Sequence, residues 1–249
     1  MNYIGIDIGS TSAKTIVLDN EGNIIDKIIM PTGWSSVETA NKIKDYLIEQ
    51  NYDISNVVAT GYGRVSVPYA AKQITEITCH AQGAVSLFDN DDLLVIDIGG
   101  QDTKIIEIQD GRVVNFVMND KCSAGTGRFL EVMSNHLGVG IDGLCDLAMS
   151  GSETTISSLC TVFAESEVVG LIGKGEPKEN IAYAVIDSII KKIVSQIGNI
   201  SYHDVVLTGG LCECNYIVKK ISDELKTNVK STPNARYAGA LGAAIRGKE

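Results

Sequence analysis

Short apolar runs that end in polar, glycine-containing turns dominate the first half of the chain. One run covers residues 3–6 and another covers residues 93–96. Each is followed by a second apolar stretch that ends at a turn containing Gly22 or Gly111. Paired apolar runs joined in this way predict β-hairpins.

Helical spacing of apolar residues follows the first hairpin and returns near residue 180. In residues 37–49, Ala40, Ile43 and Leu47 recur three or four positions apart. A longer stretch ending at Gly198 has an apolar residue at every fourth position: Ile181, Val185, Ile189, Ile193 and Ile197. These patterns predict amphipathic helices. Hairpins alternating with helices favour an α/β protein.

A repeated segment indicates two similar lobes. Residues 7–14 read Asp-Ile-Gly-Ser-Thr-Ser-Ala-Lys, and residues 97–104 read Asp-Ile-Gly-Gly-Gln-Asp-Thr-Lys. Asp, Ile, Gly and Lys are in register at an offset of 90. We expect a first lobe formed by residues 1–92 with 232–249, and a second lobe formed by residues 93–231.

The repeated turn has the composition of a phosphate-binding loop. Small and hydroxylated residues let backbone N–H groups approach phosphate oxygens, and an Asp at the strand end can hold hydrated Mg²⁺ or orient a water. A single such turn is more often an ordinary strand turn, but its duplication favours a phosphate site. We expect Asp7 and Asp97 to organise metal and water. The candidate phosphate or water contacts are Gly9, Ser10, Thr11, Ser12, Ala13, Lys14, Gly99, Gly100, Gln101 and Asp102, and Lys104 could add a further charge.

Composition places the chain among folded globular proteins. Of the 249 residues, 44% are hydrophobic and 21% are charged, which argues against disorder. The formal net charge of −10 makes attraction to nucleic acid or anionic membrane an unexpected mode of action. No apolar run approaches about 18 residues, and the first predicted strand begins almost at the N-terminus, so we expect a cytoplasmic protein with reduced thiols.

A third glycine motif completes a recognisable order. Residues 205–210 form an apolar run that ends in Gly209 and Gly210, and small residues at 239–244 favour close helix packing. With the duplicated loops, these motifs resemble the actin, sugar kinase and Hsp70 ATPase superfamily. The resemblance implies a two-lobed, ribonuclease H-like fold with ATP and Mg²⁺ between the lobes. Residues 7–14 and 97–104 would be the phosphate loops, 205–210 the adenosine motif and 235–246 a connecting helix.

Two cysteines precede predicted helices. Cys122 lies in Asn-Asp-Lys-Cys-Ser-Ala-Gly-Thr-Gly at residues 119–127, and Cys160 begins Cys-Thr-Val-Phe-Ala-Glu-Ser-Glu at residues 160–167. Helix N-termini stabilise thiolates. An iron–sulfur cubane needs four thiolates, which a two-fold dimer could supply from two per chain. On spacing alone, buried cysteines acting as small hydrophobes are the stronger interpretation.

Several motifs together point to one family. Residues 60–64, Thr-Gly-Tyr-Gly-Arg, with 97–102 and the two cysteine motifs, resemble the ATPase activators of 2-hydroxyacyl-CoA dehydratases and benzoyl-CoA reductases. The resemblance implies a homodimer that holds one [4Fe-4S] cluster through Cys122 and Cys160 of each subunit. It further implies that ATP hydrolysis drives a low-potential electron, supplied by a ferredoxin or flavodoxin, to a partner dehydratase or reductase.

Two other functions remain open at this point. The chain could be a small-molecule kinase of the same superfamily, or a nucleotide-switched binding module without redox chemistry. The remaining thiols carry less information: we expect Cys79 and Cys145 to serve packing, and Cys212 and Cys214 to be incidental because a C-x-C pair lacks the second pair of a zinc site. The sequence shows no partner for His136 or His203.

Overall fold

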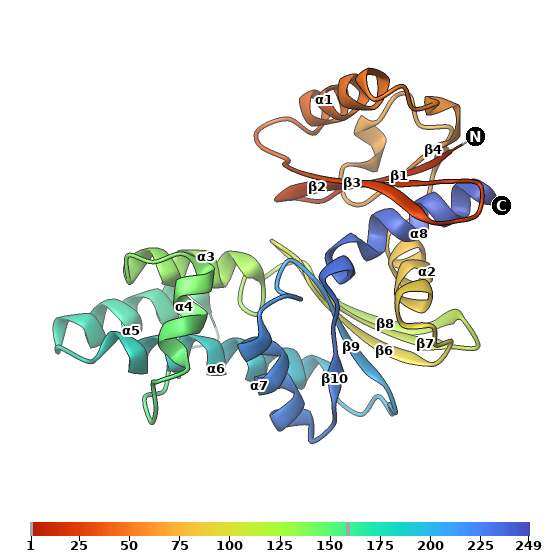
Figure 1. The fold of residues 1–249 in the computed structure, drawn as a ribbon. Coiled ribbons are helices and arrows are strands. Elements are labelled where there is room, and N and C mark those ends of the chain that lie inside the picture. Colours follow the sequence, from red (N-terminus) through yellow and green to blue (C-terminus); the bar gives the residue numbers. More distant parts are fainter. Residues whose placement is uncertain (1, 158–159) are drawn as a thin grey trace. The chain divides into compact units, whose positions relative to one another are not determined.

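The computed structural model describes residues 2–157 and 160–249 (Figure 1). The strands are β1 Tyr3–Ile8, β2 Ser12–Leu18, β3 Ile24–Pro31, β4 Val57–Thr60, β5 Lys72–Gln73, β6 Leu93–Ile98, β7 Thr103–Gln109, β8 Arg112–Asn119, β9 Val205–Gly209 and β10 Val229–Lys230. The α-helices are α1 Ser36–Glu49, α2 Glu76–Phe88, α3 Gly127–His136, α4 Ile141–Ala148, α5 Thr161–Gly173, α6 Lys178–Ile197, α7 Asn215–Leu225 and α8 Ala238–Lys248. Short 3₁₀ turns cover Ile54–Asn56, Arg64–Ser66 and Pro233–Tyr237.

The chain divides into two compact units. Unit 1 comprises Met1–Val95, Ile106–Asn115 and Asn234–Glu249, and unit 2 comprises Ile96–Ile105 and Phe116–Pro233. The division passes through β6, β7 and β8. The two lobes expected at 1–92 with 232–249 and at 93–231 stay a prediction.

The first sheet has the order β3-β2-β1-β4-β5 and lies in unit 1. β1 pairs antiparallel with β2 and parallel with β4. On one face, Ile4, Ile6 and Ile8 of β1 pack with the buried side of α1, as the apolar spacing of residues 37–49 predicts. On the other face, α8 packs against Ile16 and Leu18 of β2.

Glycines allow the backbones of β1, α2 and α8 to approach closely. A Cβ at Gly5 of β1 would collide with the Ala240 carbonyl of α8, and one at Gly242 of α8 would collide with the Cys79 carbonyl of α2. A Cβ at Gly83 of α2 would likewise collide with the Ala238 carbonyl of α8. The close helix packing predicted from the small residues at 239–244 is therefore confirmed.

The second sheet has the order β10-β9-β6-β7-β8. Its β7–β8 hairpin turns at Asp110 and Gly111, whose φ angles of 48° and 71° suit an Asp-Gly turn. The predicted helix ending at Gly198 is α6, and its five apolar residues at every fourth position are buried.

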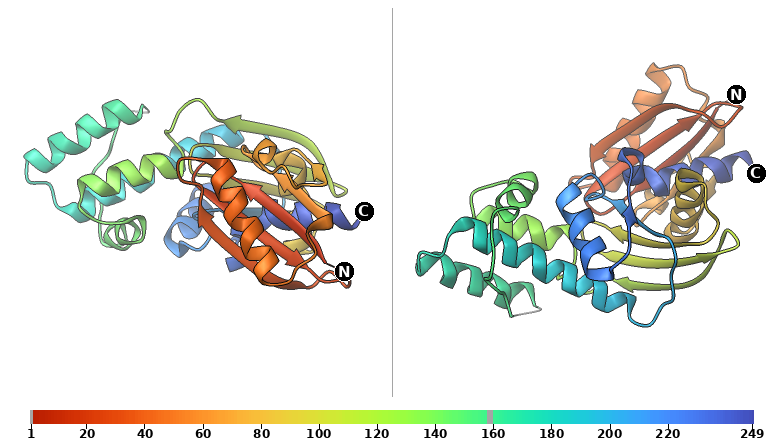
Figure 2. Two further views of the ribbon diagram at one scale, coloured as in Figure 1. Left: turned by 90° about the horizontal axis from the view of Figure 1, so that it is seen from above. Right: turned by 60° about the horizontal axis from the view of Figure 1, so that its bottom comes forward.

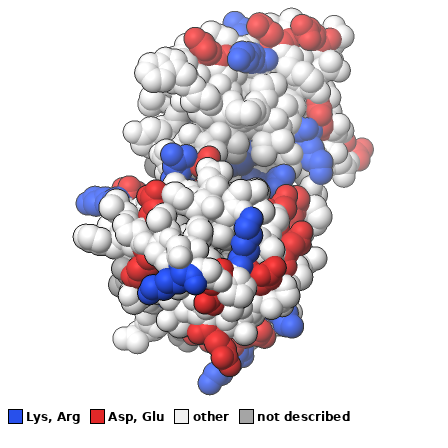
Figure 3. Space-filling view, turned by 90° about the vertical axis from the view of Figure 1, so that its left-hand side faces the viewer, with Lys and Arg blue, Asp and Glu red and all other residues white. Residues whose placement is uncertain are grey.

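The helices of unit 2 form a group of their own. Figure 2 shows α3, α4, α5 and α6 lying together, with α6 running from this group to α7. On the face in Figure 3, acidic and basic side chains are interspersed among uncharged ones. None of the helices in the described residues is long and apolar enough to cross a membrane.

Candidate functional site

The two copies of the repeated segment adopt the same turn. The Gly9 amide donates to the Ser12 carbonyl at 3.2 Å, and the Gly99 amide donates to the Asp102 carbonyl at 2.9 Å. Each turn joins the strand that ends one residue after the repeated Asp to the strand that carries the repeated Lys. In the first copy, Asp7 lies opposite Lys14 in the β1–β2 register. The duplication visible in the sequence is thus a duplication of backbone geometry.

Asp7 is a buried carboxylate surrounded by backbone. Its side chain stands near the end of β1 and the residue is only 6% exposed. Gly61, which has a φ of +84°, approaches so closely that a Cβ there would collide with Oδ1. A Cβ at Gly239 would lie 2.7 Å from Oδ2. Both positions therefore require glycine if the carboxylate is to keep its place.

Asp97 has the matching environment in unit 2. It is 4% exposed, and a Cβ at Gly209, whose φ is +85°, would lie 2.6 Å from its Oδ1. Gly209 follows Thr208 as Gly61 follows Thr60, and each Thr-Gly step ends a strand of the same sheet as the Asp. The motifs at 60–64 and 205–210 look unrelated in their predicted roles, but their Thr-Gly steps occupy equivalent positions in the two units.

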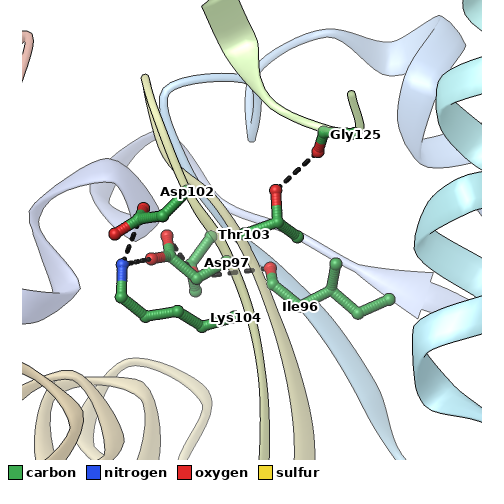
Figure 4. A network of polar contacts seen from close by, with 7 residues as sticks. Ile96, Asp97, Asp102, Thr103, Lys104 and Gly125 are labelled. Carbon is green, nitrogen blue, oxygen red and sulfur yellow. Dashed lines mark hydrogen bonds and ion pairs between the residues drawn. The ribbon is translucent and has the colours of Figure 1, made fainter. Parts of the chain in front are cut away.

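Lys104 makes a buried ion-pair network with Asp97 and Asp102 (Figure 4). Its Nζ lies 3.3 Å from Asp97 Oδ2 and 2.8 Å from Asp102 Oδ1, and the residue is 1% exposed. The Thr208 hydroxyl lies 3.4 Å from Asp97 Oδ1. Lys104 is therefore directed at carboxylates of its own unit, where it neutralises buried negative charge instead of standing open for a phosphate.

The remaining loop residues differ in exposure. Thr11 and Gln101 are exposed, and Ser10, Ser12 and Lys14 are partly exposed, so their side chains can reach solvent. Ala13, in contrast, packs in the core of unit 1, which leaves only its backbone for any contact with a ligand.

The second loop is bonded directly to the start of α3. The amides of Gly127 and Arg128 donate to the carbonyls of Gly99 and Gly100 at 2.9 and 2.7 Å. The Thr103 hydroxyl donates to the Gly125 carbonyl at 2.5 Å. Because the first amides of α3 are used in this way, the helix N-terminus holds the loop in place.

Cys122 and Cys160 are exposed thiols on neighbouring segments of unit 2. The hydroxyls of the residues that follow them, Ser123 and Thr161, are hydrogen-bonded at 2.8 Å. Cys160 is the N-cap of α5, as its predicted place before a helix requires. Cys122 is not at a helix N-terminus, because α3 has Thr126 as its N-cap and begins at Gly127. The predicted place at a helix N-terminus is confirmed for Cys160 and is wrong for Cys122.

Two side chains with no role assigned from the sequence hold the segments that carry Cys122 and Cys160. Asn119 Nδ2 donates to the carbonyls of Cys122 and Ala124 at 2.9 and 2.8 Å, which fixes the turn that carries the thiol. His136 at the end of α3 pairs with Glu165 of α5 at 2.8 Å. Asn119 stands three residues before Cys122 and could have been noted as a turn residue. The pairing of His136 has no sequence signal.

The other cysteines occupy three different environments. Cys79 is buried in α2, and this burial raises the pKa of its thiol to about 11, in keeping with a packing role. Cys212 is buried beside the Thr232 carbonyl. Cys145 and Cys214 are in contact with each other, with their Sγ atoms 2.8 Å apart. Within residues 2–157 and 160–249, no group of three or more His, Cys, Asp or Glu side chains is arranged to hold a metal ion.

Duplicated strand–turn–strand loops with buried aspartates define an actin-like ATPase fold, and comparison with known proteins confirms it. A family model for the BadF/BadG/BcrA/BcrD ATPase family matches residues 4–247. The chain belongs to this family.

Similar proteins agree over nearly the full length. The (R)-2-hydroxyglutaryl-CoA dehydratase activating ATPase of Acidaminococcus fermentans is 42% identical to this chain. The alignment covers 97% of this chain and 95% of that protein. The crystal structure of component A of that organism's (R)-2-hydroxyglutaryl-CoA dehydratase superposes on this chain with a TM-score of 0.92 and 38% sequence identity. The superposition covers 100% of this chain and 98% of the component A chain. The activator of the 2-hydroxyisocaproyl-CoA dehydratase from Clostridium difficile, with bound ADPNP, also gives 0.92, at 37% identity over 100% of this chain and 94% of its own.

The buried network makes a prediction about stability. Replacing Lys104 with Met leaves the Asp97 charge buried without its cation, so we expect a loss of about 3–5 kcal/mol in the free energy of unfolding. Lys14→Met, at the matching but partly exposed position, should cost less than about 1 kcal/mol. Adding Asp97→Asn to Lys104→Met should restore part of the loss. Denaturant titration measures all four proteins, and equal stability of the two lysine variants would contradict the assignment.

Proposed function

We propose that this chain is an ATP-hydrolysing electron donor. In this proposal it uses ATP with Mg²⁺ and holds a [4Fe-4S] cluster at the axis of a homodimer. It receives an electron from a ferredoxin or flavodoxin and passes it at low potential to a dehydratase or reductase that acts on acyl-CoA-type substrates. The names of its relatives support the class of acceptor, since these proteins are called activators of 2-hydroxyacyl-CoA dehydratases.

One observation carries the proposal: the second phosphate loop is bonded to the segment that bears the exposed thiols. Gly99 and Gly100 accept hydrogen bonds from the first amides of α3, and Thr103 donates to Gly125, three residues after Cys122. The hydrogen bond between Ser123 and Thr161 extends this connection to Cys160. A movement of the loop thus has a short bonded route to both thiols.

The thiols fit the donors that such a cluster requires. Iron–sulfur clusters are held by cysteine thiolates, and Cys122 and Cys160 are exposed on segments joined by a hydrogen bond. One chain offers two suitable sulfurs, so a second copy related by a two-fold axis would supply the other pair. When bound, the cluster would supply one-electron transfer. Asn119 would hold the Cys122 turn, and the α5 N-terminus would support Cys160.

The surface of α5 supports a dimer at the same place. Val162 and Phe163, directly after Cys160, are 66% and 65% exposed, and Val169 and Ile172 continue the exposed apolar surface along the helix. Apolar side chains of this size usually become buried when they gather at one site. An isologous contact through α5 would bury them and bring the Cys160 residues of two chains toward the axis.

The buried aspartates would act in ATP hydrolysis. Asp7 and Asp97 each stand near the end of a duplicated strand with glycine backbone against the carboxylate. Carboxylate oxygens are ligands that Mg²⁺ prefers, and they can also orient a water. Lys104 favours the ionised form of Asp97 through their ion pair. Ser10, Thr11, Ser12, Lys14 and Gln101 would contact phosphate or water, with Gly9, Gly99, Gly100, Gly209 and Gly210 allowing the close approach of backbone.

One prediction of the proposed function concerns the carboxylates of Asp7 and Asp97. Asp7→Asn and Asp97→Asn should each lower the rate of ATP hydrolysis by at least about 100-fold, because an amide neither holds Mg²⁺ as tightly nor accepts a proton. Asp110→Asn is the control, since Asn also suits the left-handed conformation of this exposed turn. Steady-state phosphate release measures the rates. Wild-type hydrolysis in both Asp7 and Asp97 variants would rule out the assignment of the two loops.

The second prediction concerns the thiols. Cys122→Ser and Cys160→Ser should each lose the iron that the wild-type protein carries after anaerobic purification, because serine is a poor ligand for a cluster. The joint replacement of Cys212 and Cys214 by Ser should leave iron content unchanged. Iron analysis and the visible absorption band distinguish these results. A colourless wild-type ATPase would favour the kinase or the nucleotide-switched binding module.

The third prediction concerns coupling between nucleotide and thiols. An external iron chelator should remove iron at different rates from the nucleotide-free, ADP-bound and ATP-analogue-bound protein under anaerobic conditions. Thr103→Val removes one of the three hydrogen bonds between the loop region and residues 125–128, so it should reduce the difference between these rates. Ser188→Ala, which removes a hydrogen bond inside α6, is the control. Identical rates in all three states, with nucleotide binding verified, would defeat the gating mechanism.

A further inference from the structure

Cys145 and Cys214 form a close thiol pair away from the proposed cluster ligands. Cys145 lies in α4, and Cys214 is the N-cap of α7. Their Sγ atoms are 2.8 Å apart although 69 residues separate them in the chain. A disulfide bond has an S–S length of about 2.05 Å, so a movement of under about 1 Å would bring the sulfurs to bonding distance.

The helices that carry the pair are held together by a second contact. The Tyr216 hydroxyl in the first turn of α7 donates to the carbonyl of Ala148, the last residue of α4, at 3.0 Å. The Lys220 ammonium lies 4.3 Å from the centre of the Tyr183 ring, which ties α7 to α6. The sulfurs are therefore held by packed helices of unit 2, which reduces the entropy lost when they react.

The two thiols differ in access and in acidity. Cys145 is 3% exposed, whereas Cys214 is partly exposed. The Cys145 thiol, with the backbone amides of Ile217 and Tyr216, holds the pKa of Cys214 below its usual range. The contact with Cys214 and the burial of the side chain raise the pKa of Cys145. When Cys214 is ionised, Cys145 stays protonated and its S–H group donates a hydrogen bond to the Cys214 sulfur.

We propose that Cys214 and Cys145 form a redox-active dithiol that reacts with low-molecular-weight disulfides, with Cys214 as the attacking thiol and Cys145 as the resolving thiol. The accessible thiolate is the nucleophile in thiol–disulfide exchange, and its buried neighbour is placed to attack the Cys214 sulfur of the mixed disulfide and displace the RS group. Cys214 follows the glycine motif that ends β9, so the disulfide would form beside one of the candidate nucleotide motifs.

The reaction balances with a small disulfide RSSR as the oxidant. Cys214 thiolate bonds to one sulfur of RSSR and releases the other as RS⁻. Cys145 Sγ then bonds to Cys214 Sγ, the mixed S–S bond breaks, and the proton of Cys145 leaves with the second RS group as RSH. The two cysteines lose two electrons, and RSSR gains them.

A metal site fits these sulfurs less well. The described residues contain no third His, Cys, Asp or Glu arranged with the pair to complete a ligand set. Cys212, the nearest cysteine in sequence, directs its thiol to the carbonyl of Thr232. Two thiols held together without further ligands suit disulfide formation.

Peptide mapping of the anaerobically purified protein tests the proposal. The protein is treated with oxidised glutathione, free thiols are blocked, and a protease that cleaves after Glu places Cys145 in peptide 132–153 and Cys214 in peptide 214–224. Cleavage after Glu213 also separates Cys212 from Cys214. We expect a disulfide that links these two peptides. The readout needs neither ATP hydrolysis nor bound iron, so its result is independent of the proposed function.

Matched variants separate the two roles. Cys145→Ser should accumulate a glutathione adduct on peptide 214–224, and Cys214→Ser should leave Cys145 at least about ten-fold slower to react than Cys214 is in the Cys145→Ser protein. Cys212→Ser should form the linkage at the wild-type rate. The proposal is overturned if wild-type protein forms adducts elsewhere without the 132–153 to 214–224 link, or if Cys145 reacts as fast as Cys214 in these variants.

Discussion

A carboxylate buried at the end of a central strand is the constraint on which both units depend. Asp7 and Asp97 are almost fully buried, and each has backbone pressed against it where a Cβ would collide, at Gly61 and at Gly209. A buried charge must find partners or a ligand, because desolvation of an isolated carboxylate is unfavourable. The glycines beside the two carboxylates and the Lys104 ion pair are the features that accommodate these buried groups.

The two units meet this constraint differently. In unit 2, Lys104 is buried and pairs with both Asp97 and Asp102. In unit 1, Lys14 stands across the strand pair from Asp7 but remains partly exposed. The equivalent lysines therefore have different electrostatic roles: Lys104 neutralises buried carboxylates of unit 2, whereas Lys14 can reach solvent. Duplication preserved the backbone turn, while the side chains around it diverged.

Much of the fold could be predicted because its signals are local. The repeat at an offset of 90, the apolar spacing of α1 and α6, and the Asp-Gly turn are all readable within short windows of sequence. The equivalence of Gly61 and Gly209 did have a sequence signal, because Val-Val-Ala-Thr-Gly at residues 57–61 recurs as Val-Val-Leu-Thr-Gly at residues 205–209. The misplacement of Cys122 has a local cause: the segment from Ser123 to Thr126 forms a turn before α3 begins, and periodicity alone cannot tell such a turn from a first helical turn.

Contacts between distant residues were beyond the reach of sequence, and the cysteines show why. Burial raises the pKa of the Cys79 thiol, Cys122 and Cys160 are exposed, and the fold brings Cys145 against Cys214. Sequence alone favoured packing for Cys145, and it favoured no role for Cys214 because the C-x-C pair that Cys214 forms with Cys212 lacks the second pair of a zinc site. The chemistry of a thiol is set by its neighbours in space, and α4 and α7 become neighbours only when α6 and the Tyr216–Ala148 hydrogen bond hold them together. The same residue type therefore lies in a packed core, on exposed segments and in a close thiol pair within one chain, because the fold keeps those environments apart.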